Sequence, residues 1–220
     1  MKNKKLNVAI EIAIFASIAV VLDMIQSGLF KGVFASGGSI GIACVPILII
    51  SYRRGLTSGI LCGLIVSLLQ MLSGVYVIQG SSFDSSFMQV AGPFIQILLD
   101  YVLAYTLVGF AGAFSKLYKK SNTKGMKALW LILGSLLGTF LKYLSHVLSG
   151  IWFWLGDGSS SFVGVANNTH LYSWVYNGAY SIPNMLLSTI IIVIIGLLYE
   201  FLLNPEIKNN ESSEEIINEK

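Results

Sequence analysis

Long apolar segments separated by short polar ones recur along almost the whole chain. An α-helix that rises 1.5 Å per residue needs about 20 apolar residues to cross a hydrocarbon core of roughly 30 Å. The pattern therefore predicts an all-α integral membrane bundle of six transmembrane helices. These are expected at residues 7–30, 40–52, 55–78, 90–115, 127–155 and 173–203. The second segment is short, which favours a tilted or partly re-entrant element.

Composition supports a membrane protein and sets the domain boundary. Of the 220 residues, 55% are hydrophobic and 11% are charged, against about 25% charged in ordinary soluble domains. We expect one membrane domain over residues 1–203 and a short polar, acidic cytoplasmic tail over 204–220 that lacks fixed structure. Cys44 and Cys62 lie inside apolar segments, so they are expected as small buried hydrophobic residues and not as a disulfide or a metal pair.

Basic residues gather in alternate connections and so predict the orientation. They precede the first segment, separate the second from the third, and separate the fourth from the fifth: Lys2, Lys4, Lys5, Arg53, Arg54, Lys116, Lys119, Lys120, Lys124 and Lys127. The other connections carry only Lys31. The positive-inside rule then places both termini in the cytoplasm of a multi-pass protein of the cell membrane. The net charge of +3 is explained by this topology and calls for no nucleic-acid partner.

One acidic residue stands out in the fourth segment. Asp100 is the only charge between Asp84 and Lys116, flanked by FIQILL and YVLAYTLVGF. A carboxylate at that depth is costly and is usually retained because it binds or relays something. A structural partner such as Lys142 could also neutralise it. Glu11 and Asp23, near the ends of the first segment, are expected as interfacial residues or packing partners.

Further polar and aromatic side chains are expected at a similar depth. Asp100 is about ten residues, or roughly 15 Å, from the outer end of its helix, and His146 is at nearly the same level. Lys142 lies one turn from His146 on the same helix face and is expected to be structural. One cavity open to the outside could hold these candidates: Asp100, His146, Trp154, Tyr172 and Asn177, with Tyr76 ending the third helix. Trp152, His170 and Asp157 are expected at the membrane interface or the surface.

Such a cavity suits a small, planar, cationic ligand. A desolvated carboxylate supplies a counter-charge, and aromatic rings supply cation–π and stacking surfaces. Histidine, asparagine and tyrosine supply directional hydrogen bonds to a heteroaromatic ring. An anionic substrate would favour clusters of arginine, and the chain has only Arg53 and Arg54.

Four segments resemble one known family. They read ACVPILIISYRRGLTSGILCGLI, LLDYVLAYTLVGFAG, LKYLSHVLSGIWFW and YSWVYNG, and they are similar to the thiamine-specific substrate-binding component (S component) of energy-coupling-factor (ECF) transporters. The similarity covers roughly residues 7–200 in matching order. It implies six helices and capture of thiamine from outside. It also implies delivery with a transmembrane coupling subunit and two cytoplasmic ATPase subunits.

The resemblance also implies roles for individual residues. The family's ligand-contacting positions fall on Tyr76, Asp100, Tyr101, His146, Trp154, Tyr172 and Asn177. On the first helix, Ala9, Ala13 and Ser17 form a small-residue face of the kind that lets another helix approach closely, and in the family a similar stripe docks onto the coupling subunit. The chain departs from well-known relatives at Asp100, where they have Glu. It also has Phe34 as the sole aromatic of the segment GVFASGGSIG, where some have tryptophan.

Other functions are less consistent with the sequence. No GxxxxGK[ST] motif is present, so active transport would draw energy from a partner or an ion gradient. The alternative is a solitary proton-coupled permease for a small cationic heteroaromatic, with Asp100 and His146 as a proton relay. A membrane enzyme ranks lowest, because GxSxG, HExxH and paired catalytic aspartates are all missing. We expect no cofactor and no metal site.

Overall fold

The fold is helical throughout the part of the chain that can be described. A computed structural model describes residues 2–34, 38–154 and 169–205, and within these ranges every regular element is a helix. The elements are α1 (Lys2–Leu29), α2 (Val45–Arg54), α3 (Leu56–Met71), η1 (Gly80–Ser82), α4 (Ser86–Ile97), η2 (Leu98–Val102), α5 (Leu103–Thr106), η3 (Leu107–Phe114), α6 (Ser115–Lys120), α7 (Lys124–Ser149), η4 (Gly150–Trp154), α8 (Thr169–Leu198) and α9 (Glu200–Leu203). The all-α prediction is confirmed. Asp157 and most of the expected acidic tail lie outside the described residues.

Within the described ranges, four continuous helical stretches are long and apolar enough to cross a membrane. They are Asn3–Leu29, Ser86–Lys120, Lys124–Trp154 and His170–Leu198. The predicted second and third spans are shorter, because α2 has 10 residues and α3 has 16. At 1.5 Å per residue α2 is about 15 Å long, roughly half the hydrocarbon thickness. Leucine and isoleucine side chains are exposed along these helices, as expected for surfaces that face lipid.

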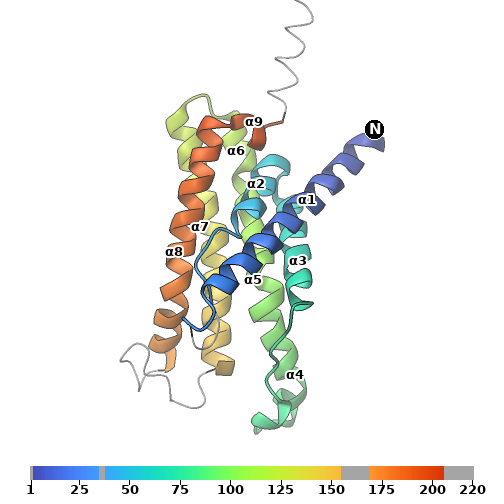
Figure 1. The fold of residues 1–220 in the computed structure, drawn as a ribbon, viewed down its shortest axis with the longest axis vertical. Helices are drawn as coiled ribbons and strands as arrows, with labels where there is room; N and C mark the ends of the chain where they lie inside the picture. The colour runs from blue at the N-terminus through green and yellow to red at the C-terminus, as the bar shows by residue number, and fades with distance from the viewer. Residues whose placement is uncertain (1, 35–37, 155–168, 206–220) are drawn as a thin grey trace, which may run out of the picture.

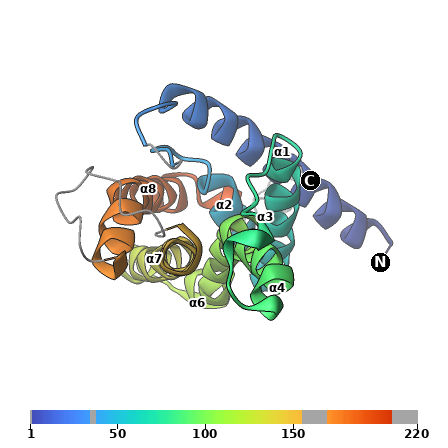
Figure 2. The ribbon, with the colours of Figure 1, turned by 90° about the horizontal axis from the view of Figure 1, so that it is seen from below.

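The helices form a bundle with α1 on its outside. α7 packs against α8 and against η3, and η3 packs against α3 (Figure 1). α1 crosses α2 and α3 obliquely, and its N-terminal end projects beyond the bundle (Figure 2). Ile12, Ala16 and Ala19 are buried on the inner face of α1. One side of the first helix therefore faces the bundle and the other side remains exposed.

One half of the bundle is closely packed at the level of the backbone. A Cβ atom on Gly109 of η3 would lie within 3 Å of the backbone nitrogen of Ile60, and one on Gly63 of α3 would clash with the carbonyl of Tyr105. Small residues thus allow α3 to touch both η3 and α5 directly. Beside them, the fully buried Tyr52 donates to the carbonyl oxygens of two neighbouring α7 residues, at 2.8 and 2.9 Å. Cys62 is buried and unpaired as predicted, and so is Cys44.

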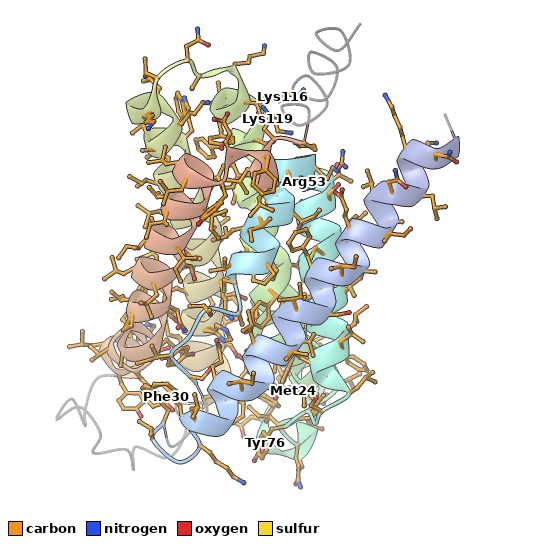
Figure 3. All side chains as sticks on the ribbon, turned by 45° about the horizontal axis from the view of Figure 1, so that its top comes forward. Met24, Phe30, Arg53, Tyr76, Lys116 and Lys119 are labelled. Carbon is orange, nitrogen blue, oxygen red and sulfur yellow. The ribbon has the colours of Figure 1, made fainter. Side chains whose placement is uncertain are left out.

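Charged residues mark one end of the bundle. Arg53, Lys116 and Lys119 lie at one end and Tyr76 lies toward the other (Figure 3). At the basic end Glu11 accepts from Arg53 at 3.0 Å and from the neighbouring Arg54 at 2.6 Å. Glu11 therefore joins α1 to α2, which agrees with its expected role as a packing partner.

Several helix boundaries differ from the predicted ones, and two of them bear on the position of the polar side chains. The third predicted helix, expected to reach residue 78 with Tyr76 at its end, stops at Met71, and residues 74–79 have no regular secondary structure. Gly74, with φ of 130°, adopts a backbone conformation that breaks the helix and that other residues rarely adopt. The helix that carries Asp100 begins at Ser86, four residues before the expected residue 90. The carboxylate is therefore further from the start of its helix than predicted.

Candidate ligand-binding cavity

A cavity of about 700 Å³ lies in the half of the bundle away from the basic end. Its walls come from α1, α3, the column from α4 to α5, α7 and α8. All seven positions proposed from the sequence line this cavity: Tyr76, Asp100, Tyr101, His146, Trp154, Tyr172 and Asn177. The structure therefore brings together residues that are as far as 101 positions apart, from Tyr76 to Asn177.

Three of these residues, Asp100, Tyr101 and Trp154, lie in π-helical turns. η2 carries Asp100 within the helical stretch Ser86–Lys120, and η4 follows α7 and ends at Trp154. A π turn inserts one extra residue and redirects the side chains around it, and such turns are frequent at functional sites. Gly150 begins η4, and a Cβ atom there would clash with the Ser173 hydroxyl of α8. Glycine thus lets the end of α7 approach α8 closely.

The Asp100 carboxylate is partly buried and held by neutral donors. Trp154 donates its indole N–H to Oδ2 at 2.8 Å, and Gln96 donates to the same oxygen at 2.9 Å. Nδ1 of His146 lies 3.9 Å from Oδ1. Across the described ranges no lysine or arginine nitrogen approaches Asp100 within 4.0 Å. Lys142 is therefore not its ion-pair partner, although the sequence left that role open.

Aromatic rings form one wall of the cavity beside this carboxylate. The Tyr76 ring lies 5.1 Å from the Trp154 ring, tilted by 42°. The backbone N–H of Tyr76 donates to the Tyr101 hydroxyl at 2.9 Å, and Gln96 donates to the Tyr76 carbonyl at 3.2 Å. These bonds attach the segment over residues 74–79 to η2 and α4. Tyr76 is 65% exposed, so part of its ring remains available for contact.

The opposite wall belongs to α8 and is buried. Tyr172 stacks on Tyr176 at 5.7 Å between ring centres. Asn177 donates to the Ser173 carbonyl at 3.0 Å and accepts from the Tyr180 hydroxyl at 2.5 Å. This pair of bonds fixes which end of the Asn177 amide is the acceptor. Next to them Phe34, the sole aromatic of the segment GVFASGGSIG, packs its ring 5.5 Å from Tyr180.

Sequence reasoning missed several polar residues of the cavity. Asp23 was expected at the interface or in packing, yet it lines the cavity and accepts from Tyr105, Gln70 and Gln26, the last at 3.2 Å. Asn184 of α8 donates to the Ser39 carbonyl at 2.7 Å and thereby holds the segment from residue 38 onward against α8. The available signal was the same as for Asp100, since ionisable and amide side chains inside apolar segments are expensive.

The predicted docking residues lie far from the cavity. Ala9, Ala13 and Ser17 are exposed on α1, on the side that faces away from the bundle. Ser17 donates its hydroxyl to the Ala13 carbonyl at 2.9 Å, so its polar group is satisfied within the helix. The exposed strip therefore presents small groups and no unpaired donor.

Comparison with known proteins identifies the family. The profile described as "Thiamine transporter protein (Thia_YuaJ)" matches residues 9–203. The chain belongs to this family. Among curated proteins of the family, the thiamine transporter ThiT of Bacillus subtilis (strain 168) is 32% identical over 197 residues, covering 88% of this chain and 92% of the relative. ThiT of Lacticaseibacillus paracasei is 30% identical over 200 residues, covering 90% and 89%.

A solved structure supports the same assignment. ThiT from Listeria monocytogenes superposes with a TM-score of 0.71 at 29% identity, covering 92% of this chain and all of that chain. The resemblance to thiamine-specific S components predicted from the sequence is thereby confirmed. Membership of the thiamine transporter family makes the chain a membrane transport protein and not an enzyme.

Proposed function

We propose that the chain is the thiamine-binding membrane subunit of an ECF-type, ATP-driven vitamin importer. It captures thiamine from the outside and delivers it together with a transmembrane coupling subunit and two cytoplasmic ATPase subunits. The relatives are named thiamine transporters. Within this chain, Tyr76, Asp100, Tyr101, His146, Trp154, Tyr172 and Asn177 are the proposed ligand contacts.

The observation that carries the proposal is the environment of Asp100. Its carboxylate accepts from Trp154 and lies beside His146 with no described lysine or arginine within 4.0 Å. An aromatic cavity that contains such a carboxylate favours a cation with a flat ring, as the thiazolium of thiamine is. The volume of about 700 Å³ falls within the usual range of small-molecule sites, about 300 to 1,000 Å³.

We further propose six crossings, with both termini in the cytoplasm. The support is the basic end that carries Arg53, Lys116 and Lys119 opposite Tyr76. In this arrangement the short α2 and α3 supply two crossings, and the cavity opens outward. Residues 1–203 form the membrane domain and 204–220 a cytoplasmic tail.

The first experiment is a fluorescence titration of the purified protein in detergent with thiamine. The chain has four tryptophans, and Trp154 lies in the cavity wall, so ligand stacking is expected to quench emission. Saturable quenching that is lost in Trp154→Ala but kept in Trp152→Ala supports the site. Trp152 is a matched control because it is 58% exposed and does not line the cavity. No response up to millimolar thiamine from folded protein refutes the assignment.

The exposed α1 strip of Ala9, Ala13 and Ser17 is the proposed docking surface for the coupling subunit. Small residues let helices in lipid approach closely, and bulk at the contact prevents this. Ala13→Trp is expected to bind thiamine normally but to abolish ATP-driven uptake in the complete complex. Ile18→Trp introduces the same side chain at another exposed part of α1 and is expected to keep uptake. Normal uptake by Ala13→Trp would show that this strip is not the docking surface for the coupling subunit.

A solitary proton-coupled permease is the second candidate. The observation in its favour is the 3.9 Å approach of His146 to Asp100, because such pairs can relay protons. Liposomes that contain this chain alone separate the two functions. Our proposal predicts binding without accumulation, whereas accumulation that collapses with the proton gradient supports the permease.

A further inference from the structure

A second polar layer lies one helical turn deeper in the cavity than Asp100. Tyr105 follows Asp100 by five residues, and Lys142 precedes His146 by four. Both helices lead from those positions toward the basic end, so the deeper layer lies about 6 to 7.5 Å further in. Asp23 of α1 and Gln70 of α3 complete the layer, and all four side chains line the cavity.

One tyrosine ring connects the two charges of this layer. Tyr105 donates its hydroxyl to Asp23, and the ammonium of Lys142 lies over the face of the same ring, 3.4 Å from its centre. Hydrogen bonding to a carboxylate increases the electron density of the phenol ring, which strengthens its attraction for a cation. Gln70 donates to the other oxygen of Asp23. The two charges are therefore held near each other without a direct ion pair.

The cavity has a simple balance of formal charges. Among its lining residues the carboxylates are Asp23 and Asp100, and the ammonium is Lys142. With His146 counted as neutral, one negative charge is left over. Charges in such a weakly polar, membrane-enclosed space interact strongly with one another and with any ion that enters. A ligand that carries one positive charge would neutralise this remaining negative charge.

We propose that Asp23 and Lys142, joined through Tyr105, act as an inner charge pair that selects ligands by net charge. Asp23 offsets Lys142, so Asp100 alone faces the ligand as an uncompensated carboxylate. This inference rests on the proposed thiamine function and adds to it two specificity-determining residues on helices α1 and α7. The pair favours a monocation over a neutral molecule of the same shape.

The proposal predicts opposite effects for the two partners. Asp23→Asn leaves Lys142 uncompensated, which repels a cation and leaves a neutral ligand almost unaffected. Lys142→Gln leaves two carboxylates, which attract a cation more strongly. The double variant restores the original balance. A purely structural role would weaken the binding of both ligands alike, because neither variant then distinguishes them by charge.

The experiment compares two ligands on the purified full-length protein. One is thiamine, and the other is its neutral isostere in which a thiophene replaces the thiazolium ring. The measured quantity is the ratio of the neutral ligand's Kd to that of thiamine. Asp23→Asn is expected to lower this ratio about tenfold, Lys142→Gln to raise it by a similar factor, and the double variant to return it within about threefold of wild type.

Controls separate charge from folding. Asp84→Asn and Lys31→Gln make the same two charge changes at exposed positions outside the cavity, and the ratio is expected to stay unchanged. Asp23→Glu and Lys142→Arg keep the charges and are expected to keep the ratio. If Asp23→Asn does not fold, the other two variants still test the proposal. The Kd ratio is expected to rise in Lys142→Gln and to stay unchanged in Lys142→Arg.

Two failures can be told apart. If wild-type protein does not bind thiamine, the proposed function fails. If wild type binds thiamine but both single variants leave the ratio within about threefold of wild type, the inner charge pair is refuted and the thiamine site stands. Changes of the same sign in the two variants also overturn the proposal.

Discussion

The two halves of the bundle differ in how closely the same helices pack. Toward the basic end, α3 and η3 touch at backbone distance through Gly59 and Gly109, and Tyr52 donates its hydroxyl to buried carbonyls. Toward the other end, the helices separate around a cavity of about 700 Å³ lined by polar and aromatic side chains. The first half holds the helices together, which allows the second half to remain hollow.

The helix column from Ser86 to Lys120 shows how this change is made. It is wound as a π helix at η2, where Asp100 lines the cavity, and as a 3₁₀ helix at η3, where Gly109 meets α3. A π turn is wider than an α turn and a 3₁₀ turn is tighter. One continuous crossing therefore broadens beside the ligand site and narrows at the helix contact.

The largest effect is expected from crowding the packed half. In Gly109→Ala the new methyl group would lie within 3 Å of backbone atoms of Gly59 and Ile60, so the helices must separate. We expect a loss of about 2 kcal/mol or more in unfolding free energy, measured by thermal unfolding in detergent. Thiamine affinity of the folded protein should change little.

A matched substitution tests that prediction. Gly125 at the start of α7 has no atom within 4 Å of its Cβ position, so Gly125→Ala should be neutral or slightly stabilising. Equal destabilisation by the two substitutions would show that the contact between α3 and η3 is not special.

The next effect belongs to the cavity half. Asp100→Asn keeps an acceptor for Trp154 but removes the charge, so we expect thiamine affinity to fall at least about tenfold, or ~1.4 kcal/mol, measured by calorimetric titration. Unfolding free energy should change by less than about 0.5 kcal/mol. The exposed Asp84→Asn serves as the control. Unchanged thiamine affinity in Asp100→Asn would show that the carboxylate charge does not contribute to thiamine binding.

The smallest effect is expected from removing the buried Tyr52 hydroxyl in the closely packed half of the bundle. Tyr52→Phe removes a buried hydroxyl that donates to the carbonyls of Trp130 and Leu131. We expect a loss of about 1 kcal/mol in unfolding free energy with thiamine affinity unchanged. Tyr199→Phe changes a tyrosine that is 52% exposed and should have no measurable effect. A loss of affinity in Tyr52→Phe would show that the two halves are coupled.

The sequence predicted the helical class and most of the long helices. Apolar length located the long helical stretches, and a charge inside an apolar run drew attention to Asp100. Residue counts along two helices also placed His146 near the same level. The structure brings both to one cavity, because helical rise is regular enough to convert sequence position into depth.

The sequence pattern could not predict where a helix changes to π winding or which helices lie side by side. The π turns at η2 and η4 leave no mark in hydrophobic periodicity, and the end of α3 depends on Gly74. Asp23 was expected as an interfacial residue or a packing partner, and its place in the cavity was missed because its partners, Gln70 and Tyr105, come from other helices. Periodicity gives the depth of a residue but not which helix lies beside it.

The most direct test of the central claim is an experimental structure of the protein with thiamine bound. The account predicts the thiazolium ring within about 4 to 6 Å of the Asp100 carboxylate, with an aromatic ring of the ligand stacked on Trp154 or Tyr76. Ligand density elsewhere in the bundle, with the cavity around Asp100 unoccupied, would contradict it.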